Sequence, residues 1–337
     1  MKYSIIVPVF NRPDEVDELL ESLCHQDVKD FEVIIVEDGS EKPCKDVCDK
    51  YANILDLHYY FKENSGPGQS RNYGVERAKG DYVIILDSDV VLPTGYLEAV
   101  DTELTSSISP LPSSIAAWGG PDASHPSFTP IQKAISYSMT SFFTTGGIRG
   151  GKGKKLDKFF PRSYNMGIRR EVYQELGGFT KMRFGEDIDF SYRIIEAGYK
   201  TALIPEAWVW HKRRTDFRKF FRQVYNSGIA RINLEKRHPG TMELVHLLPM
   251  VFTLGVMGCL LLAPFCYGLT LLPLLLYCLL LLIDSTILNK SLKVGLLSIP
   301  AAFTQLMGYG FGFLESWWKR CVLKQDEFTA FEKNFYK

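Results

Sequence analysis

The chain has 337 residues, with 39 Lys and Arg against 39 Asp and Glu, and therefore no formal net charge. This balance argues against a nucleic-acid binder, which normally carries a basic excess. A charged fraction of 23% with 13% aromatic residues argues against disorder. The mean hydropathy of −0.06 is that of an ordinary soluble enzyme of one large or two modest domains.

This average hides two unlike parts. No charged side chain lies between Glu243 and Asp284, and a second uncharged stretch covers residues 294–314. Because a membrane span needs about 20 apolar residues, the first stretch can hold two spans. Charge stays balanced in both parts, with 7 basic and 6 acidic residues from 241 to 337. The sequence therefore predicts a soluble domain followed by a membrane domain.

The soluble part alternates short apolar runs, typical of buried strands, with helix signals. In chain order we expect strand 3–9, a helix from 13, strand 31–36, helix 43–51, strand 57–61, helix 68–78, strand 82–86 and helix 94–104. Weaker signals predict strand 115–120, helices 173–176 and 188–196, and strands 201–204 and 207–210. This alternation predicts a parallel, doubly wound sheet, whose ligands bind beyond the carboxyl ends of the strands.

Acidic motifs directly follow two of these strands. Asp87-Ser88-Asp89 follows the strand at 82–86. Paired carboxylates suit a hard divalent cation that keeps waters and binds substrate phosphates, although the same residues also form helix-capping turns. The residues EDGS at 37–40 follow the strand at 31–36. A carboxylate there can accept hydrogen bonds from a base or ribose, and an ordinary Asp-Gly turn is the alternative.

Two further motifs lie at predicted helix starts. The Gly-rich segment 64–74 opens a helix that carries Arg71. Helix N-termini and Arg both favour phosphate or a polar base, and an ordinary helix start is the alternative. The segment is neither a Walker loop nor the dinucleotide fingerprint. Glu186 and Asp187 begin a later helix, where either the helix dipole favours acids or one carboxylate is a general base.

Together, in this order, the motifs resemble those of the family-2 glycosyltransferases of the GT-A fold, over roughly residues 1–240. The segment 6–11 (IVPVFN) resembles the opening strand of that family, and EDGS is similar to its D-D-G-S with Glu in the first place. Segment 64–74 is similar to N-x-G-x-x-x-A-R-N-x-G with Ser in the Ala position. Residues 87–89, 177–179 and 186–187 match the family's D-x-D, G-G-F and E-D.

The resemblance implies an α/β GT-A doubly wound mixed sheet, as in nucleotide-diphospho-sugar transferases, followed by α-helical membrane segments. It also implies a nucleotide-diphospho-sugar donor, Mg²⁺ or Mn²⁺, and inversion at the anomeric carbon. It assigns donor contacts to Pro8, Val9, Asn11, Glu37, Asp38, Gly66, Arg71, Asp87 and Ser88.

By the same resemblance Asp87, Asp89 and His211 would bind the metal, and Asp187 with Glu186 would form the catalytic pair. Asp187 would deprotonate the acceptor hydroxyl. His211 follows a predicted strand, and a surface His at a strand end is the alternative.

A basic amphipathic helix is expected at 213–225, because four apolar residues recur there at i, i+3, i+4 and i+7. We favour a position on an anionic membrane surface over packing on the domain. The helix lacks the Q-x-x-R-W signature of processive synthases, which favours transfer of one sugar over polymer extrusion. The basic loop 146–162 (Arg149, Lys152, Lys154, Lys155, Lys158 and Arg162) is either a lid over the donor or a solvated mobile loop.

The apolar runs 247–262 and 269–283 predict a membrane hairpin. The third run, 294–314, is weaker, and a full span there would put Lys319 and Arg320 outside, against the positive-inside rule. We therefore expect three membrane-embedded segments, of which two or three are membrane helices; whether 294–314 spans fully or is re-entrant or interfacial stays open.

The predicted domains are a catalytic domain at 1–210, an interfacial helix region at 211–240, membrane helices at 241–318 and a polar tail at 319–337. Since no signal peptide is visible, we expect the catalytic domain at the cytoplasmic face of the inner (plasma) membrane. The expected partners are the donor, a lipid-linked or cell-surface glycan acceptor and the membrane, without nucleic acid. The alternatives are a polyprenyl-phosphate sugar synthase and a non-catalytic nucleotide-binding membrane scaffold.

Overall fold

The computed structural model describes residues 1–105, 115–125, 127–145, 159–212 and 214–331. The chain divides into two compact units. The first consists of Met1–His125 and Lys152–His211, and the second of Pro126–Gly151 and Lys212–Lys337. Each unit is thus built from two separate stretches of chain. The sequence-derived domain limits at 210, 240 and 318 stay a prediction.

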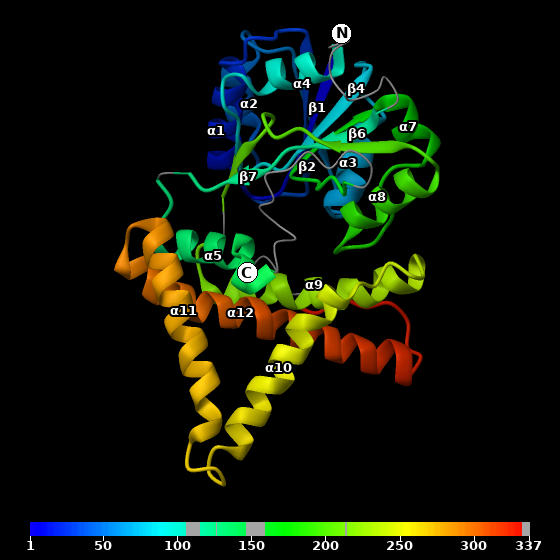
Figure 1. Cartoon of the computed structure of the whole chain (residues 1–337). Helices are drawn as coiled ribbons and strands as arrows, with labels where there is room; N and C mark the ends of the chain where they lie inside the picture. The colour runs from blue at the N-terminus through cyan, green and yellow to red at the C-terminus, as the bar shows by residue number, and fades with distance from the viewer. Residues whose placement is uncertain (106–114, 126, 146–158, 213, 332–337) are drawn as a thin grey trace. The chain divides into compact units, whose positions relative to one another are not determined.

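The first unit contains a seven-stranded sheet of order β3-β2-β1-β4-β8-β6-β9. Strand β8 is antiparallel to both of its neighbours, whereas the first four strands are parallel to one another. The mixed sheet implied by the resemblance is confirmed. The parallel pairing predicted from alternation holds for β3, β2, β1 and β4 and for β6 with β9, but not for β8. The strands are β1 (Tyr3–Val9), β2 (Phe31–Asp38), β3 (Leu57–Lys62), β4 (Tyr82–Leu86), β6 (Ile115–Gly119), β8 (Asn165–Arg169) and β9 (Lys200–Leu203) (Figure 1).

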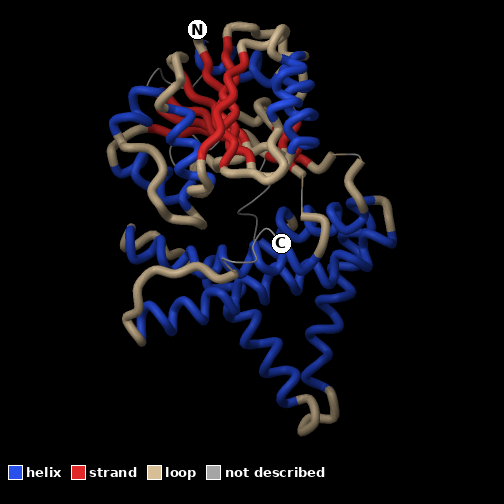
Figure 2. Tube along the Cα trace, turned by 180° about the vertical axis from the view of Figure 1, so that it is seen from behind, coloured by secondary structure: helices blue, strands red, loops and turns tan. Residues whose placement is uncertain are grey.

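Helices cover both faces of this sheet (Figure 2). Successive residues of β1 face opposite sides: Ile5 and Val7 pack in one cluster with α1 and α4, and Ile6 packs in another with α7 and α8. The helices of this unit are α1 (Pro13–Cys24), α2 (Lys45–Tyr51), α3 (Pro67–Val75), α4 (Tyr96–Thr105), α7 (Arg170–Glu175) and α8 (Glu186–Glu196).

A small second sheet completes the first unit. It has the order β5-β10-β7, with β5 (Val90–Val91), β7 (Asp122–Ala123) and β10 (Val209–His211). In the antiparallel pair of β10 with β5, His211 lies opposite Val90. This register brings residue 211 beside the acidic motif that precedes β5.

The described part of the second unit is helical. Its elements are α5 (Pro130–Thr140), α6 (Phe142–Thr145), α9 (Phe217–Arg237), α10 (Leu244–Leu262), the 3-10 turn η1 (Leu269–Leu271), α11 (Leu272–Asn289), α12 (Leu292–Trp317) and the π-helical turn η2 (Trp318–Val322). Within the described part of the chain, three helical segments are long and apolar enough to cross a membrane, namely Leu244–Leu262, Leu269–Asn289 and Leu292–Val322. In both views α9 and α12 run side by side, and α10 and α11 diverge from a shared turn (Figures 1 and 2).

Small residues let α9 and α12 approach closely. A β-carbon on Gly228 of α9 would lie 2.1 Å from the Tyr309 carbonyl oxygen of α12, and one on Gly312 would lie 2.0 Å from the Tyr225 carbonyl oxygen. Close backbone approach at small residues is typical of helix pairs in membranes. Two residues of the predicted amphipathic stripe, Phe220 and Val224, are buried in a cluster with α5 and α12. Protein therefore covers much of the apolar stripe that the sequence predicts for a membrane surface.

Candidate active site

The acidic motifs meet at one edge of the large sheet. Strand β1 pairs in parallel with both β2 and β4. The carboxyl ends of these strands therefore lie together, with Asn11 after β1, Glu37 and Asp38 at the end of β2, and residues 87–89 after β4. Ligands of doubly wound sheets bind at this edge.

Asp87, Asp89 and His211 form a cluster with the ligand types of a divalent metal site. Their donor atoms all lie within 4.8 Å of one another. His211 Nε2 is 3.3 Å from Asp89 Oδ1, and the imidazole stacks on the Tyr164 ring at a centroid distance of 4.8 Å. Nδ1 of His211 is buried without a hydrogen-bond partner among the described residues. The Nδ1 atom faces Asp122 Oδ2 at 4.0 Å. Two carboxylates and an imidazole fit Mg²⁺ or, better, Mn²⁺.

Arg12 is an unforeseen neighbour of this cluster. Its guanidinium forms a short ion pair with Asp89 Oδ2. The pair sets a positive charge against an aspartate whose side chain is only 11% exposed, and buried carboxylates need such compensation. The signal was present in the sequence, because Arg12 directly follows the end of the first strand and Asn11.

Arg71 joins three elements through a buried fork. Its two terminal nitrogens donate to Asp87 Oδ1 and to Glu186 Oε1, each at 2.8 Å. The guanidinium carbon also lies 5.2 Å from the centroid of the Phe179 ring, within range of a cation–π contact. Burial raises the pKa of Glu186 to about 7, against the opposing pull of Arg71. The fork therefore fixes α8 to the Asp87 motif through a carboxyl that titrates near neutral pH.

Asp187 lies beside Glu186 in the first turn of α8. Its Oδ1 accepts a hydrogen bond from the backbone N–H of Ile188 at 2.9 Å, and its Oδ2 is 3.5 Å from the Arg162 guanidinium. The carboxylate keeps 15% of its side-chain surface exposed, which allows a hydroxyl to reach it. Arg162 is the described member of the predicted basic loop. The other five (Arg149, Lys152, Lys154, Lys155 and Lys158) lie outside the described residues.

Asp38 holds the Gly-rich turn before α3. Its Oδ1 accepts from Lys62 Nζ at 2.5 Å and from the Ser65 N–H at 2.9 Å, and its Oδ2 accepts from the Gly66 N–H at 2.9 Å. Gly66 has φ +90°, a conformation that Gly adopts without strain. Lys62 ends β3, and sequence reasoning did not single it out. The Asp38 carboxylate therefore serves first to shape this turn.

Glu37 is fully buried, and both of its oxygens have partners. Oε1 accepts a short hydrogen bond from the Ser40 hydroxyl, and Oε2 accepts the Cys44 N–H at 2.7 Å. Asn11 is tied to the same loop, since its N–H donates to Ser40 Oγ at 2.7 Å and its Oδ1 accepts from the Lys42 N–H at 2.9 Å. Glu37 thus organises the loop that holds Asn11.

The remaining predicted donor residues present little side chain to a ligand. Val9 and Ser88 are 1% and 5% exposed, and Pro8 of β1 is half-buried. Any contact of Val9 with a donor therefore has to use its backbone.

The sheet order and the acidic carboxyl edge define the class of fold. A mannosyltransferase from Pyrobaculum calidifontis, solved in complex with GDP-Man and Mn²⁺, has the same fold. It is 16% identical, the match covers 95% of this chain and 88% of that one, and the TM-score is 0.58. The first unit is thus a GT-A domain.

Residues 4–177 match the model of glycosyl transferase family 2. Since the match spans more than half of the chain, the protein belongs to this family.

Curated relatives share parts of the sequence. The pre-mycofactocin glycosyltransferase of Mycobacterium tuberculosis is 27% identical over 250 residues, which are 70% of this chain and 48% of the relative. The GalNAc(5)-diNAcBac-PP-undecaprenol beta-1,3-glucosyltransferase of Campylobacter jejuni is 34% identical over 102 residues, 29% of this chain and 33% of that protein. The chain therefore spans about half or less of the length of these relatives.

Proposed function

We propose that the protein transfers a single sugar from a nucleotide-diphospho-sugar donor to a lipid-linked or cell-surface glycan acceptor, with a divalent metal and inversion. The observation that carries the proposal is the convergence of Asp87, Asp89 and His211 within 4.8 Å, beside the Arg71–Glu186 pair. The GDP-Man and Mn²⁺ of the Pyrobaculum structure support the donor class and the metal. The diphospho-undecaprenol in the name of the Campylobacter relative supports a lipid-linked acceptor.

The donor side of the reaction requires charge compensation at the diphosphate. Asp87, Asp89 and His211 would hold a Mg²⁺ or Mn²⁺ ion, which when bound supplies Lewis-acid stabilisation of the departing diphosphate. Arg71 holds the Asp87 carboxylate in place, and Arg12 offsets the charge of Asp89. Both contacts pre-organise the acidic cluster before the donor arrives.

The acceptor side requires a base. Asp187 takes the proton of the acceptor hydroxyl while that oxygen bonds to the anomeric carbon and the bond from this carbon to the diphosphate breaks. A single displacement of this kind inverts the configuration. General base catalysis contributes about 10²–10⁴ in rate. Glu186 is engaged with Arg71, so we assign it the task of positioning the first turn of α8.

The nucleoside side is shaped by the loop contacts. We assign direct donor contacts to Asn11 and Gly66 at the carboxyl edge of the sheet. Asp38 acts through the turn that it holds, and Pro8, Val9 and Ser88 contribute mainly through their backbone. Glu37 contributes through the Ser40 and Cys44 contacts that hold the loop. This assignment gives the Glu substitution in the family's D-D-G-S motif a role, because the longer side chain spans from β2 to the start of α2.

We propose that α10 and α11 cross the membrane as a hairpin, with the catalytic unit at the cytoplasmic face. For α12 we propose an interfacial or re-entrant position. In support, 44% of its most apolar window is buried, against 11% in each of the other two segments, and it runs beside the basic helix α9. This arrangement keeps Lys319 and Arg320 on the cytoplasmic side, as the positive-inside rule prefers. A C-terminal tag reached by protease only from the outside would contradict it.

The test of activity incubates the purified 337-residue chain and membranes with a panel of nucleotide sugars and Mn²⁺. Release of nucleoside diphosphate and the product mass identify the donor and distinguish a glycan from a polyprenyl phosphate acceptor. We expect release with at least one donor and its near-complete loss in Asp187→Asn. The matched control is Asp46→Asn, which removes an exposed carboxylate of α2. Absence of release with every donor, or full transfer by Asp187→Asn, would contradict the proposal.

A further inference from the structure

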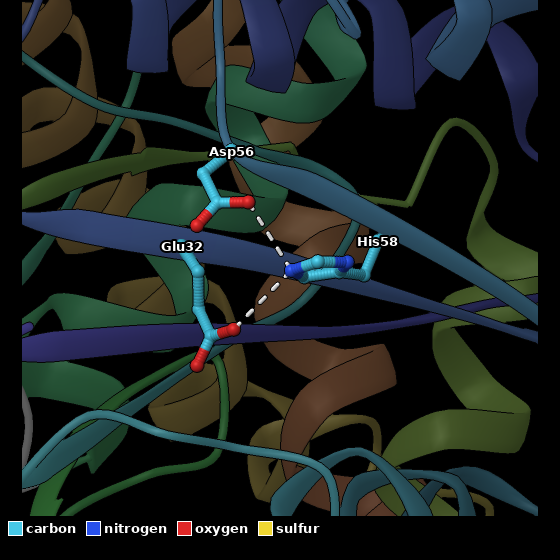
Figure 3. Close-up of side chains that lie close together, drawn as sticks. All are labelled: Glu32, Asp56 and His58. Carbon is cyan, nitrogen blue, oxygen red and sulfur yellow. Dashed lines mark ion pairs between the residues drawn. The ribbon is translucent and has the colours of Figure 1, made fainter.

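A second cluster of side chains of metal-ligand types lies at the opposite edge of the sheet from the candidate donor site. Glu32 is near the start of β2, Asp56 directly precedes β3, and His58 is near the start of β3. The parallel register of the two strands and the hydrogen bond from the Val33 N–H to the Asp56 carbonyl (2.8 Å) bring the three residues together. Their donor atoms lie within 4.8 Å of one another, and both carboxylates point at the Nε2 atom of His58 (Figure 3).

Glu32 leaves one buried oxygen directed into this cluster. The residue is 0% exposed. Its Oε1 accepts hydrogen bonds from Ser4 Oγ and from the Lys79 N–H, both at 2.6 Å. Its Oε2 is buried with no hydrogen-bond partner in the described part of the chain. Leaving a buried carboxylate oxygen without a donor is costly, so this oxygen calls for a positively charged ligand.

A proton on His58 does not meet this need. Nε2 lies 3.4 Å from Glu32 Oε2 and 3.2 Å from Asp56 Oδ1 and forms a hydrogen bond with neither. One N–H can point straight at only one of the two oxygens, and a charge-assisted hydrogen bond to it shortens to about 2.7–2.9 Å, whereas both oxygens lie farther from Nε2 than that. Among the described residues, no side chain other than His58 forms an ion pair with Glu32 or Asp56.

The two separations from His58 Nε2 are close to the edge of a metal tetrahedron, and the Glu32 and Asp56 oxygens lie within 4.8 Å of each other. Bonds of about 2.0–2.1 Å to nitrogen and oxygen place neighbouring tetrahedral ligands about 3.3–3.4 Å apart, whereas octahedral neighbours lie about 3.0 Å apart. One imidazole and two carboxylates also form a ligand set that Zn²⁺ accepts, with water in the fourth position.

We propose that Glu32, Asp56 and His58 bind a divalent transition-metal ion of the Zn²⁺ class, separate from the metal of the donor site. Two carboxylates match the charge of the ion, and the partial exposure of Asp56 and His58, 47% and 31%, gives it a path from solvent. Glu32 of β2 already accepts hydrogen bonds from Ser4 of β1 and from the Lys79 N–H. An ion bound to Glu32 and Asp56 would therefore link the turn before β3 to β2, to β1 and to the segment at Lys79. The role of this ion is structural. Its binding can therefore be measured without an assay of sugar transfer.

The test is Co²⁺ binding to the full-length chain in detergent after removal of metals with a chelator. All proteins carry Asp89→Asn, which weakens the donor cluster. We expect one Co²⁺ per chain with the intense visible absorption of tetrahedral coordination. His58→Ala should lose this band and bind at least about 100-fold more weakly, since loss of even an outer-shell partner costs about 10–100-fold. The matched control is His25→Ala, an exposed imidazole beside Glu21, which should keep the band.

A second measurement separates ligand loss from misfolding. Zn²⁺ should raise the melting temperature of the parent and of His25→Ala but not that of His58→Ala. Asp56→Asn, which changes a half-exposed side chain, should fold normally and show the same loss. A parent without a tetrahedral band and without a Zn²⁺-dependent shift would overturn the proposal. Binding that survives in both His58→Ala and Asp56→Asn would overturn it as well.

Discussion

Replacing Glu186 with Gln removes the one carboxyl of the proposed active site whose pKa burial raises to about 7. Relative to an ordinary Glu at 4.5, the shift disfavours the charged form by about 3 kcal/mol at 1.36 kcal/mol per pKa unit. The side chain is 10% exposed, so solvent screening removes little of this energy.

The sign follows from proton linkage. Between pH 4.5 and 7 the unfolded chain has lost the proton of Glu186, while the folded protein still holds it. Stability therefore falls as pH rises through this window and levels off above it. In Glu186→Gln this contribution is absent. We expect the wild type to lose about 3 kcal/mol more stability than the variant between pH 4.5 and 8.

Activity should respond in the opposite direction. Protonation of Glu186 weakens its hydrogen bond with Arg71, whose second contact orients Asp87. We expect kcat/KM for the donor to fall below pH 7 in the wild type, by up to tenfold per pH unit. In Glu186→Gln we expect kcat/KM to be lower than in the wild type at high pH and not to fall further below pH 7.

The assay is nucleoside diphosphate release between pH 5 and 9, together with melting temperatures over the same range. Glu175→Gln, which changes an exposed carboxyl of α7, is the control and should keep the fall in kcat/KM below pH 7. If kcat/KM of Glu186→Gln still fell below pH 7 as in the wild type, titration of the buried Glu186 carboxyl would not be the cause of that fall, and the prediction would be refuted.

Three further predictions concern the metal, the base and the helix pair. Asp89→Asn should raise the Mn²⁺ concentration for half-maximal activity at least about tenfold, and an unchanged Mn²⁺ titration would count against the cluster. Asp187→Asn should lower turnover about 10²–10⁴-fold while calorimetry shows nucleoside diphosphate still binding. Gly228→Leu, whose β-carbon would meet the Tyr309 carbonyl at 2.1 Å, should destabilise the chain by about 1–3 kcal/mol. Gly255→Leu in α10, where a β-carbon would meet no atom of the described residues within 4 Å, should melt as the wild type does. Equal melting of both variants would contradict the packing.

Local pattern predicted the parallel half of the sheet well. The limits of β1 and β4 agree with the expectation, because both are apolar runs bounded by turn residues. Strand β8 was missed, since its sequence NMGIR is short, contains a Gly and has only two apolar residues. A β-carbon on Gly167 would lie 2.0 Å from the Trp118 ring, so a contact across the sheet determines this residue. Such a contact is not visible in local periodicity.

Helix α5 was missed although a local signal existed. Thr129 and Gln132 form a capping box around Pro130 at the first helical position, a sequence pattern that indicates a helix start. That this helix packs in the second unit could not be predicted, because the two stretches of that unit are separated by 60 residues of the first unit.

For the candidate site, the sequence placed the acids at strand ends but not their partners. Asp87 and Asp89 were expected at the carboxyl edge because they directly follow a buried strand. The guanidinium of Arg12 beside Asp89 and the ammonium of Lys62 on Asp38 join segments far apart in sequence. Which carboxylates remain free for a ligand depends on such long-range pairs, so the roles of these residues stay predictions.

The reversed direction of β8 changes which part of the chain can serve the carboxyl edge. In a parallel strand, only the loop that leaves the strand reaches this edge. Strand β8 instead starts there, with Asn165 opposite Leu86, so the residues that enter it bring Tyr164 against His211 and Arg162 to Asp187. Departing and arriving loops thus border the candidate site from two sides. Under the proposed function, we expect substitutions in the arriving loop to alter acceptor preference while the strand ends that carry Asp87 and Asp89 stay unchanged.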